Sequence, residues 1–227
     1  TETDRIQNQL RDDPRNPHLY YRLGNVYFDQ RQYREALAVY ERTLELDPNH
    51  AAAWCNLGLT RRRLNDLDGA KQAYQRALEL EPNDLTTLNN LAAVCRLKGD
   101  WEEALTVVRR LTDLAPNTVA VWADRATLAF RLECYEEAAA AIQRVIELDP
   151  GHADDYYSLG MCYYQMGSVE QACTTWLTAL AYNPKHTATR KILPEAYWRL
   201  GDFQKAWEAV AECERLGIPV DIEFRAR

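Results

Sequence analysis

The stretch AAAWCNLGLTRRRLNDLDGAKQAYQRALELEPND, residues 51–84, contains two runs of apolar residues at helical spacing. The first run includes Trp54, Leu57 and Gly58, which follow the i, i+3, i+4 spacing of one face of a helix. The second run has the same period and consists of Ala70, Tyr74, Ala77 and Leu78. Pro82 follows it, and proline cannot continue a helix. The stretch therefore predicts two helices that form a hairpin and end near Pro82.

The same pattern recurs along the chain with a period of 34 residues. A proline and an alanine keep this interval in one register. They are Pro14, Pro48, Pro82, Pro116, Pro150 and Pro184, and Ala36, Ala70, Ala104, Ala138, Ala172 and Ala206. A fixed period of this length is the signature of a repeat architecture. Because one hairpin cannot bury its apolar faces alone, the sequence predicts a stack of hairpins.

Small residues stand where the two helices of a hairpin face each other. Gly24, Gly58 and Gly160 lie in predicted first helices, and the alanine column lies in the second helices. A larger side chain there would overpack the contact at a cost of about 1–3 kcal/mol. The paired helices are therefore expected to approach closely.

Five features resemble the tetratricopeptide-repeat (TPR) family: the 34-residue period, the run Trp54-x-x-Leu57-Gly58, the alanine column, the aromatic residues Tyr40 and Tyr74, and the closing proline. The resemblance implies an all-α, right-handed superhelical solenoid of helix-turn-helix units. It predicts an N-terminal capping helix at 1–16, six units at 17–50, 51–84, 85–118, 119–152, 153–186 and 187–220, and at 221–227 a tail or the start of a truncated further helix. The motif residues build the scaffold, so they do not identify a partner.

Some positions depart from the pattern. Arg61 and Arg125 replace a tyrosine and a leucine, so two packing sites are altered. Pro194 replaces glycine inside a predicted first helix, where proline costs about 3 kcal/mol. We therefore expect a kinked or late-starting helix near Pro194. In the first segment Ile6 and Leu10 are apolar among polar residues, as expected for a cap that ends the core in water.

Composition narrows the class of protein. The chain has 227 residues, of which 47% are hydrophobic, and a formal net charge of -7. Phosphate backbones attract basic proteins, so the charge argues against nucleic acid as a partner. No apolar run approaches the roughly 20 residues that cross a bilayer. The six cysteines form no CxxC pair, which favours a reducing compartment and predicts a cytoplasmic location. The sequence begins at Thr1, so an upstream signal or anchor remains open.

Catalytic signatures are missing from the sequence. It has no GxxxxGK[ST], HExxH or GxSxG motif, so we predict neither an enzyme nor a cofactor or metal site. His50, His152 and His186 recur at one place in separate hairpins and should not converge on one ion, so they are predicted to be solvated residues at helix starts. Paired carboxylates such as Glu102 and Glu103 suit the positive end of a helix dipole.

The resemblance implies that partners bind a concave face formed by the first helices. The residues predicted there are Tyr21, Asn25, Phe28, Arg62, Arg63, Asn89, Arg96, Phe130, Arg131, Tyr157, Met161, Tyr164, Trp198 and Arg199. Six basic residues on this face outnumber three acidic ones, and they are Arg62, Arg63, Arg96, Arg131, Lys191 and Arg199 against Asp29, Asp154 and Glu195. The arginines either recruit acidic groups or cover apolar neighbours with their stems, and the aromatic residues either anchor a partner or pack on adjacent helices.

These features predict a protein-interaction scaffold that binds a peptide segment or partner protein of apolar and acidic character in its groove. Asn56 and Asn90 form a partial asparagine column that resembles the backbone-gripping column of O-linked N-acetylglucosamine transferases. One alternative is a structural protein that assembles into homo-oligomers. Another is the targeting or interaction region of a larger enzyme or of a secretion or assembly component.

Overall fold

The computed structural model describes residues 1–220, in which there are thirteen α-helices and no strand, so the all-α prediction is confirmed. The chain forms two compact units, Thr1–Pro116 and Asn117–Arg227. Unit 1 contains α1 (Glu2–Asp12), α2 (Pro17–Asp29), α3 (Tyr33–Leu46), α4 (Ala51–Arg63), α5 (Leu67–Leu80), α6 (Leu85–Lys98) and α7 (Trp101–Leu114). Unit 2 contains α8 (Val119–Arg131), α9 (Tyr135–Leu148), α10 (Ala153–Gln165), α11 (Val169–Tyr182), α12 (Thr187–Arg199) and α13 (Phe203–Arg215).

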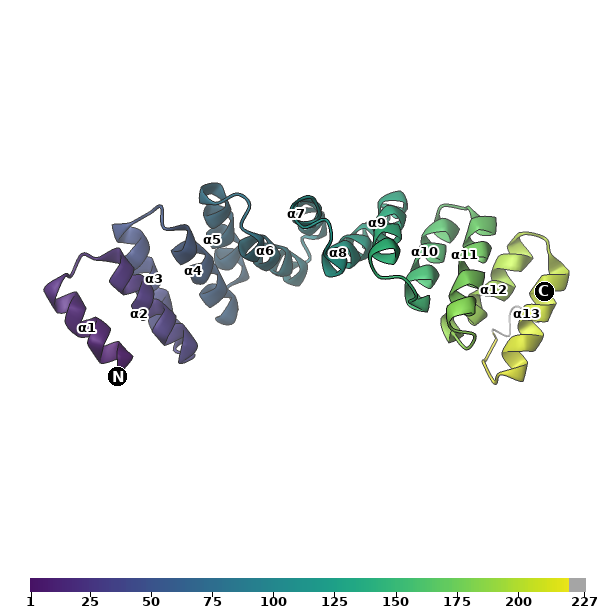
Figure 1. Ribbon diagram of the computed structural model, residues 1–227, viewed down its shortest axis with the longest axis horizontal. Coiled ribbons are helices and arrows are strands. Elements are labelled where there is room, and N and C mark those ends of the chain that lie inside the picture. The colour runs from purple at the N-terminus through teal and green to yellow at the C-terminus, as the bar shows by residue number, and fades with distance from the viewer. Residues whose placement is uncertain (221–227) are drawn as a thin grey trace. The chain divides into compact units, whose positions relative to one another are not determined.

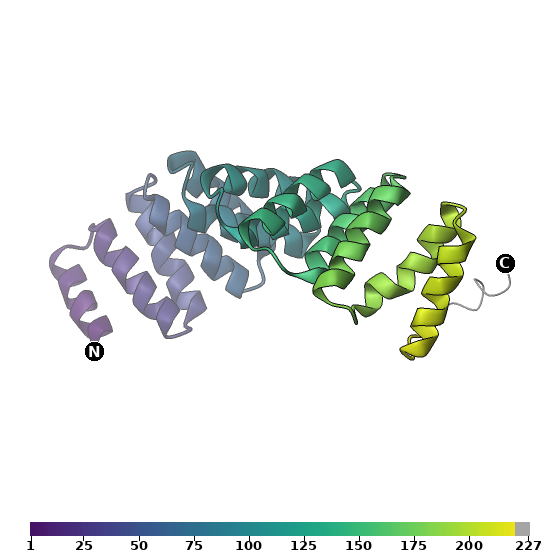
Figure 2. The same ribbon diagram turned by 45° about the vertical axis from the view of Figure 1, so that its right-hand side comes forward.

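Within each unit the helices follow one another as antiparallel pairs (Figures 1 and 2). The first helices of the six pairs begin at Pro17, Ala51, Leu85, Val119, Ala153 and Thr187, which are 34 residues apart. The sequence period is therefore the period of the helices.

None of the helices in residues 1–220 is long and apolar enough to cross a membrane.

The helix α1 covers the open end of the first hairpin. Thr1 and Asp4 form a capping box at its start, in which each side chain bonds the backbone of the other. Ile6 is completely buried against Leu19 and Leu23 of α2, and Leu10 packs at the edge of this cluster. The polar remainder of α1 faces water, as expected for a cap. The predicted tail at 221–227 lies outside the described residues.

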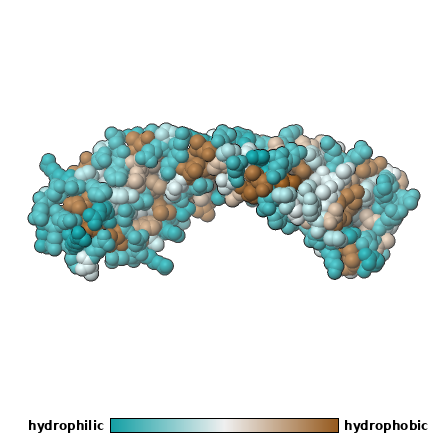
Figure 3. Space-filling model, viewed as in Figure 1, coloured by the Kyte–Doolittle hydropathy of each residue, from teal (hydrophilic) through white to brown (hydrophobic). Residues whose placement is uncertain are grey.

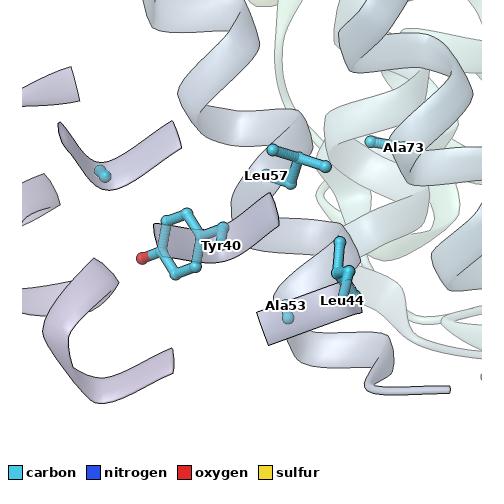
Figure 4. Packing of buried hydrophobic residues seen from close by; sticks show 6 residues of the cluster. Tyr40, Leu44, Ala53, Leu57 and Ala73 are labelled. Carbon is cyan, nitrogen blue, oxygen red and sulfur yellow. The ribbon is translucent and has the colours of Figure 1, made fainter. Parts of the chain in front are cut away.

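In the first repeat the core forms around a large side chain on the second helix. In unit 1, Tyr40 and Leu44 of α3 pack with Ala53 and Leu57 of α4, and Ala73 of α5 joins them (Figure 4). All five are at most 7% exposed. The cluster joins consecutive hairpins, so burial of apolar surface stabilises the stack as well as each hairpin.

A large residue on the second helix faces a glycine sixteen residues earlier on the first helix. A Cβ atom added to Gly24 would lie 2.5 Å from the ring of Tyr40, and one added to Gly58 would lie 2.7 Å from the ring of Tyr74. For Gly160 the nearest atom of the opposing tryptophan would be only 2.3 Å away. Real Cβ contacts are not this short, so a ring at one position requires glycine at the other.

Where the second helix carries a smaller residue instead of a ring, the facing position of the first helix is occupied by alanine or proline and not by glycine. These pairs are Ala92 with Val108, Ala126 with Ile142, and Pro194 with Val210, whereas the ring pairs are Gly24 with Tyr40, Gly58 with Tyr74, and Gly160 with Trp176. A larger side chain at one position is therefore accompanied by a smaller one at the other, so the total volume stays within what a close-packed contact can hold.

The two arginines that depart from the repeat pattern join helices by ion pairs. Arg61 of α4 lies 3.0 Å from Glu41 of α3, and Arg125 of α8 lies 2.8 Å from Glu137 of α9. The guanidinium group of Arg125 also stacks over the ring of Trp122. At these two sites the lost apolar packing is replaced by charged hydrogen bonds.

Pro194 lies inside α12, which begins at Thr187 in register with the other first helices, so the predicted late start is wrong. Proline has no N–H, so the carbonyl of Arg190, four residues earlier, lacks its helical donor. The thiol of Cys213 on α13 donates to this carbonyl over 3.2 Å. Burial raises the pKa of the Cys213 thiol, which keeps it protonated as a donor. The second helix thus satisfies the group that proline leaves open.

Gly58→Ala is expected to lower the free energy of unfolding by about 1–3 kcal/mol, because the new Cβ would overlap the Tyr74 ring. Adding Tyr74→Ile should recover part of this loss, since Ala126 and Ile142 coexist in the fourth repeat. Urea denaturation of the parent, both single variants and the double variant forms a double-mutant cycle. A coupling free energy below about 0.5 kcal/mol would mean that the two sites are independent and would contradict the pairing.

Pro194→Ala is expected to raise the free energy of unfolding by about 1–3 kcal/mol, because alanine restores the helical N–H that the Arg190 carbonyl lacks. The volume fits, since Ala92 opposite Val108 already combines the same residue types. Pro184→Ala is the matched control, because Pro184 lies between helices and its replacement should not stabilise the chain. Thermal and urea unfolding measure both variants, and a destabilised Pro194→Ala chain would contradict this account.

Candidate partner-binding surface

Two of the predicted groove residues in unit 1 are engaged by contacts with their own hairpin and with the next one. The side-chain oxygen of Asn25 accepts hydrogen bonds from the hydroxyl of Tyr40 at 2.7 Å and from the amide of Asn56 at 2.9 Å. Tyr21 accepts from the same Asn56 amide, and its ring lies 4.6 Å from that of His50. These residues join α2, α3 and α4. The amide nitrogen of Asn56 is therefore used inside the scaffold, and the backbone-gripping role that the asparagine column implied stays a prediction.

Other predicted residues of unit 1 differ in how far they are engaged. Phe28 packs edge-on against Tyr33 with ring centroids 5.3 Å apart, and the amide of Asn89 donates to the carbonyl of Leu85 in its own helix. Arg96 is half-buried on α6. The surface formed by these residues is therefore largely braced by contacts within the unit.

Arg62 and Arg63 carry positive charge that no ion pair neutralises within residues 1–220, whereas the adjacent Arg61 is paired with Glu41. Both lie in the last turn of α4, where a cation also favours the helix dipole. In unit 1 the predicted positive face thus includes two arginines whose charges can interact with acidic groups of a partner.

Unit 2 contains a cavity of about 420 Å³ between α8, α9 and α10. Three of the predicted groove residues, Phe130, Tyr157 and Met161, line it. The other lining residues are Ala123, Ala126, Thr127, Ile142, Val145, Asp155 and Ser158. The space-filling view shows hydrophobic residues breaking the hydrophilic surface in this part of unit 2 (Figure 3). The cavity is of the size and character that ligand sites favour.

The cavity arises because the fourth repeat lacks the ring that pairs with glycine in other repeats. In the fifth repeat Trp176 fills the space beside its first helix and donates from its indole nitrogen to the carbonyl of Tyr157 over 3.0 Å. In the fourth repeat the same place holds Ile142, which is smaller and carries no ring. Ala123 and Thr127 of α8 are also small, so nothing fills the volume that a ring would take.

Asp155 was not among the predicted site residues. It lies on the buried side of α10, at the place that Leu19, Ala53, Thr87, Val121 and Thr189 occupy in the other repeats. Its side chain makes no ion pair or hydrogen bond with any residue from 1 to 220. Burial raises the pKa of its carboxyl. Nearby His152 lowers this pKa, and the negative charges of Asp154 and Asp149 raise it further. The sequence signal that could have identified it is a carboxylate in an otherwise uncharged column of the repeat alignment.

The remaining predicted residues of unit 2 are not among those that line the cavity. The guanidinium group of Arg199 stacks 4.5 Å over the ring of Tyr164, and its Nε lies 3.3 Å from Glu195. Trp198 packs edge-on against Phe203. Arg131 is exposed at the end of α8. The positive charge of Arg199 is therefore offset within α12, which weakens the predicted excess of positive charge.

The repeated histidines have structural roles, so the prediction that they are merely solvated is wrong for two of them. The Nδ1 atoms of His50 and His186 accept hydrogen bonds from backbone N–H groups and cap α4 and α12. His186 is mostly buried, and its Nε2 donates to Asp154 over 2.9 Å. Only His152 is exposed. Residues 1–220 contain no cluster of three or more His, Cys, Asp or Glu side chains that could hold a metal ion.

Family models agree with the repeat pattern. Two models described as tetratricopeptide repeat match residues 21–84 and 55–119 in one case and 91–150 in the other. A model described as anaphase-promoting complex, cyclosome, subunit 3 matches residues 135–213. No curated protein sequence matches the chain.

Several solved structures have a similar fold. YrrB, described as a TPR protein with an unusual peptide-binding site, is 23% identical with a TM-score of 0.67 over 81% of this chain and 95% of its own. MamA from Desulfovibrio magneticus RS-1 is 21% identical with a TM-score of 0.59 over 74% and 94%. A chain in the structure of Naa15/Naa10 bound to HypK-THB is 18% identical with a TM-score of 0.79, and the match covers 96% of this chain and 34% of that one. At these identities the likeness concerns the fold.

Two carboxylates should respond to pH in opposite directions. The Lys71 ammonium, 2.7 Å from the Asp100 carboxylate, lowers the pKa of Asp100. The negative charge of Asp100 therefore stabilises the folded state at pH values above the ordinary carboxyl pKa of about 4. Burial raises the pKa of Asp155, so its charge destabilises the folded state as the pH rises above about 4. Asp100→Asn should therefore lower stability at pH 7 and Asp155→Asn should raise it.

Both differences from the parent chain should shrink as the pH falls. The difference for Asp155→Asn should vanish near pH 4, and that for Asp100→Asn should persist to lower pH. Urea denaturation between about pH 3 and 7.5 measures the two variants beside the parent. Shifts of the same sign for both variants at pH 7 would contradict the assignment.

Proposed function

Because the chain belongs to the tetratricopeptide-repeat family, we propose that it is a protein-interaction scaffold that binds a segment of a partner protein and has no catalytic function of its own. Its six free cysteines favour a reducing compartment, and the cytoplasm is the proposed location. The peptide-binding site named for YrrB, a protein of similar fold, supports this class of function.

The observation that carries the proposal is the cavity between α8, α9 and α10. Its lining comes mainly from the first helices α8 and α10, and its walls combine apolar side chains with the aromatic rings of Phe130 and Tyr157. Rigid aromatic walls around a small desolvated volume favour the insertion of one anchoring side chain. The cavity is preformed by helices, so little conformational entropy is lost when a segment binds.

Unit 1 contributes a second part of the proposal. Arg62 and Arg63, which no ion pair neutralises within residues 1–220, would attract acidic groups of a partner. The acidic character that the sequence predicts for the partner is therefore proposed for the segment that contacts unit 1.

Filling the cavity tests the proposal without removing a core residue. The double variant Ala126→Gly/Ile142→Tyr reproduces the pairing of Gly58 with Tyr74 and should place a ring in the cavity. Peptides of about 12 residues, selected from a random library against the parent chain, should bind this variant at least about tenfold more weakly, which is 1.4 kcal/mol.

The single variant Ala126→Gly is the matched control, because it shares one substitution and leaves the cavity open. It should bind the selected peptides as the parent does, as measured by fluorescence anisotropy. Circular dichroism and thermal unfolding establish that both variants are folded. Equal binding by the filled variant, or a library in which no peptide is enriched, would remove the cavity from the proposal.

A further inference from the structure

We propose that the cavity between α8, α9 and α10 receives a lysine or arginine side chain of the partner, with its aliphatic stem along the apolar wall and its cationic head at Asp155. This inference rests on the proposed function and names the chemistry of the residue bound there. It differs from the acidic partner that the sequence predicted.

The first argument is the combination of one carboxylate with an apolar wall. Ala126, Ile142 and Val145 offer hydrocarbon surface, and Asp155 is the one carboxylate among the residues that line the cavity. A purely apolar occupant would remove this carboxylate further from water without giving it a partner, which is unfavourable for a charge. An acidic occupant would be repelled. A long basic side chain matches both parts, because its stem is apolar and its head is charged.

The second argument is that the carboxylate is still available. The arginines of unit 2 that form ion pairs are engaged with other acids: Arg125 with Glu137, Arg144 with Glu147, Arg190 and Arg215 with Glu212, and Arg199 with Glu195. Neighbouring carboxylates have partners too, since Asp154 accepts from His186 and Asp149 lies 3.2 Å from His152. Asp155 has none among residues 1–220, although burial already disfavours its charge.

The third argument is the aromatic lining. Phe130 and Tyr157 border the same cavity as Asp155. The faces of aromatic rings attract cations, and the attraction grows when the cation leaves water. Asp154, which is almost fully exposed, adds a second negative charge close enough to act on Asp155. Asp155 and the two rings therefore offer a cation an opposite charge and aromatic faces in the same cavity.

A structural explanation of Asp155 competes with this one. Negative residues in the first turn favour a helix N-terminus, and both Asp154 and Asp155 lie in the first turn of α10. A carboxylate at an exposed position gives this stabilisation without losing its contact with water, and Asp154 already occupies such a position. The dipole therefore does not require a second carboxylate on the buried side of the helix.

The methionines of the chain provide the readout. There are only two, of which Met161 lines the cavity and Met166 does not. The full chain labelled with ¹³C at the methionine methyl groups gives two resonances, and Met166→Leu assigns them. The probes are Nα-acetyl-lysine methylamide and Nα-acetyl-norleucine methylamide, which share an aliphatic stem and differ in the terminal charge.

The lysine derivative should shift the Met161 methyl resonance in a saturable way, at least about tenfold more tightly than the norleucine derivative, and should leave Met166 unmoved. Asp155→Asn should weaken lysine binding about tenfold and leave norleucine binding unchanged. Asp154→Asn, the matched control on the exposed side of α10, should change lysine binding by less than about threefold.

The outcomes separate this inference from the proposed function. If the norleucine derivative binds as tightly as the lysine derivative, or if Asp155→Asn has no effect, the cavity takes an apolar side chain and the inference is overturned while the scaffold function stands. If neither probe shifts Met161 and the library selection also fails, both are overturned. A lysine preference lost only with Asp155→Asn supports the inference.

Discussion

The contact between a ring on the second helix and a glycine on the first controls much of this structure. It sets how closely the helices of a hairpin approach, and it decides what fills the space beside the first helix. In the first repeat the Tyr40 ring fills that space, and its hydroxyl bonds Asn25, which in turn accepts from Asn56 of the next hairpin. In the fourth repeat Ile142 leaves the space open. The scaffold and its candidate site thus arise from alternative solutions to one packing constraint.

Properties that depend on nearby residues could be predicted from the sequence. The 34-residue period and the closing prolines located the helices, because helix spacing and helix termination are local effects. Position within the repeat also found Phe130, Tyr157 and Met161, three residues that line the cavity. Position alone could not separate these from Tyr21 and Asn25, which have equivalent places in another repeat. The difference depends on what the second helix and the next hairpin present to each residue.

The errors share a physical origin. Pro194 was expected to kink or delay its helix, but α12 begins in register, and the thiol of Cys213 on the following helix bonds the carbonyl that proline leaves without a donor. His186 was expected to be solvated, but it reaches Asp154, 32 residues earlier, across the hairpin stack. Both partners lie on another helix, so no window of neighbouring residues contains them. Asp155 is different, because aligning the repeats places it in an otherwise uncharged column and would have revealed it.

Charge counted over a whole face is a weak guide to the partner of a repeat protein. The predicted excess of basic residues includes Arg199, whose charge Glu195 offsets, whereas the carboxylate at the cavity belongs to none of the positions counted. Only charges that lack a partner and lie beside a volume that a ligand can enter will select that ligand. Each repeat fills its few variable positions separately. The preference for a partner is therefore set repeat by repeat, and the net charge of -7 does not determine it.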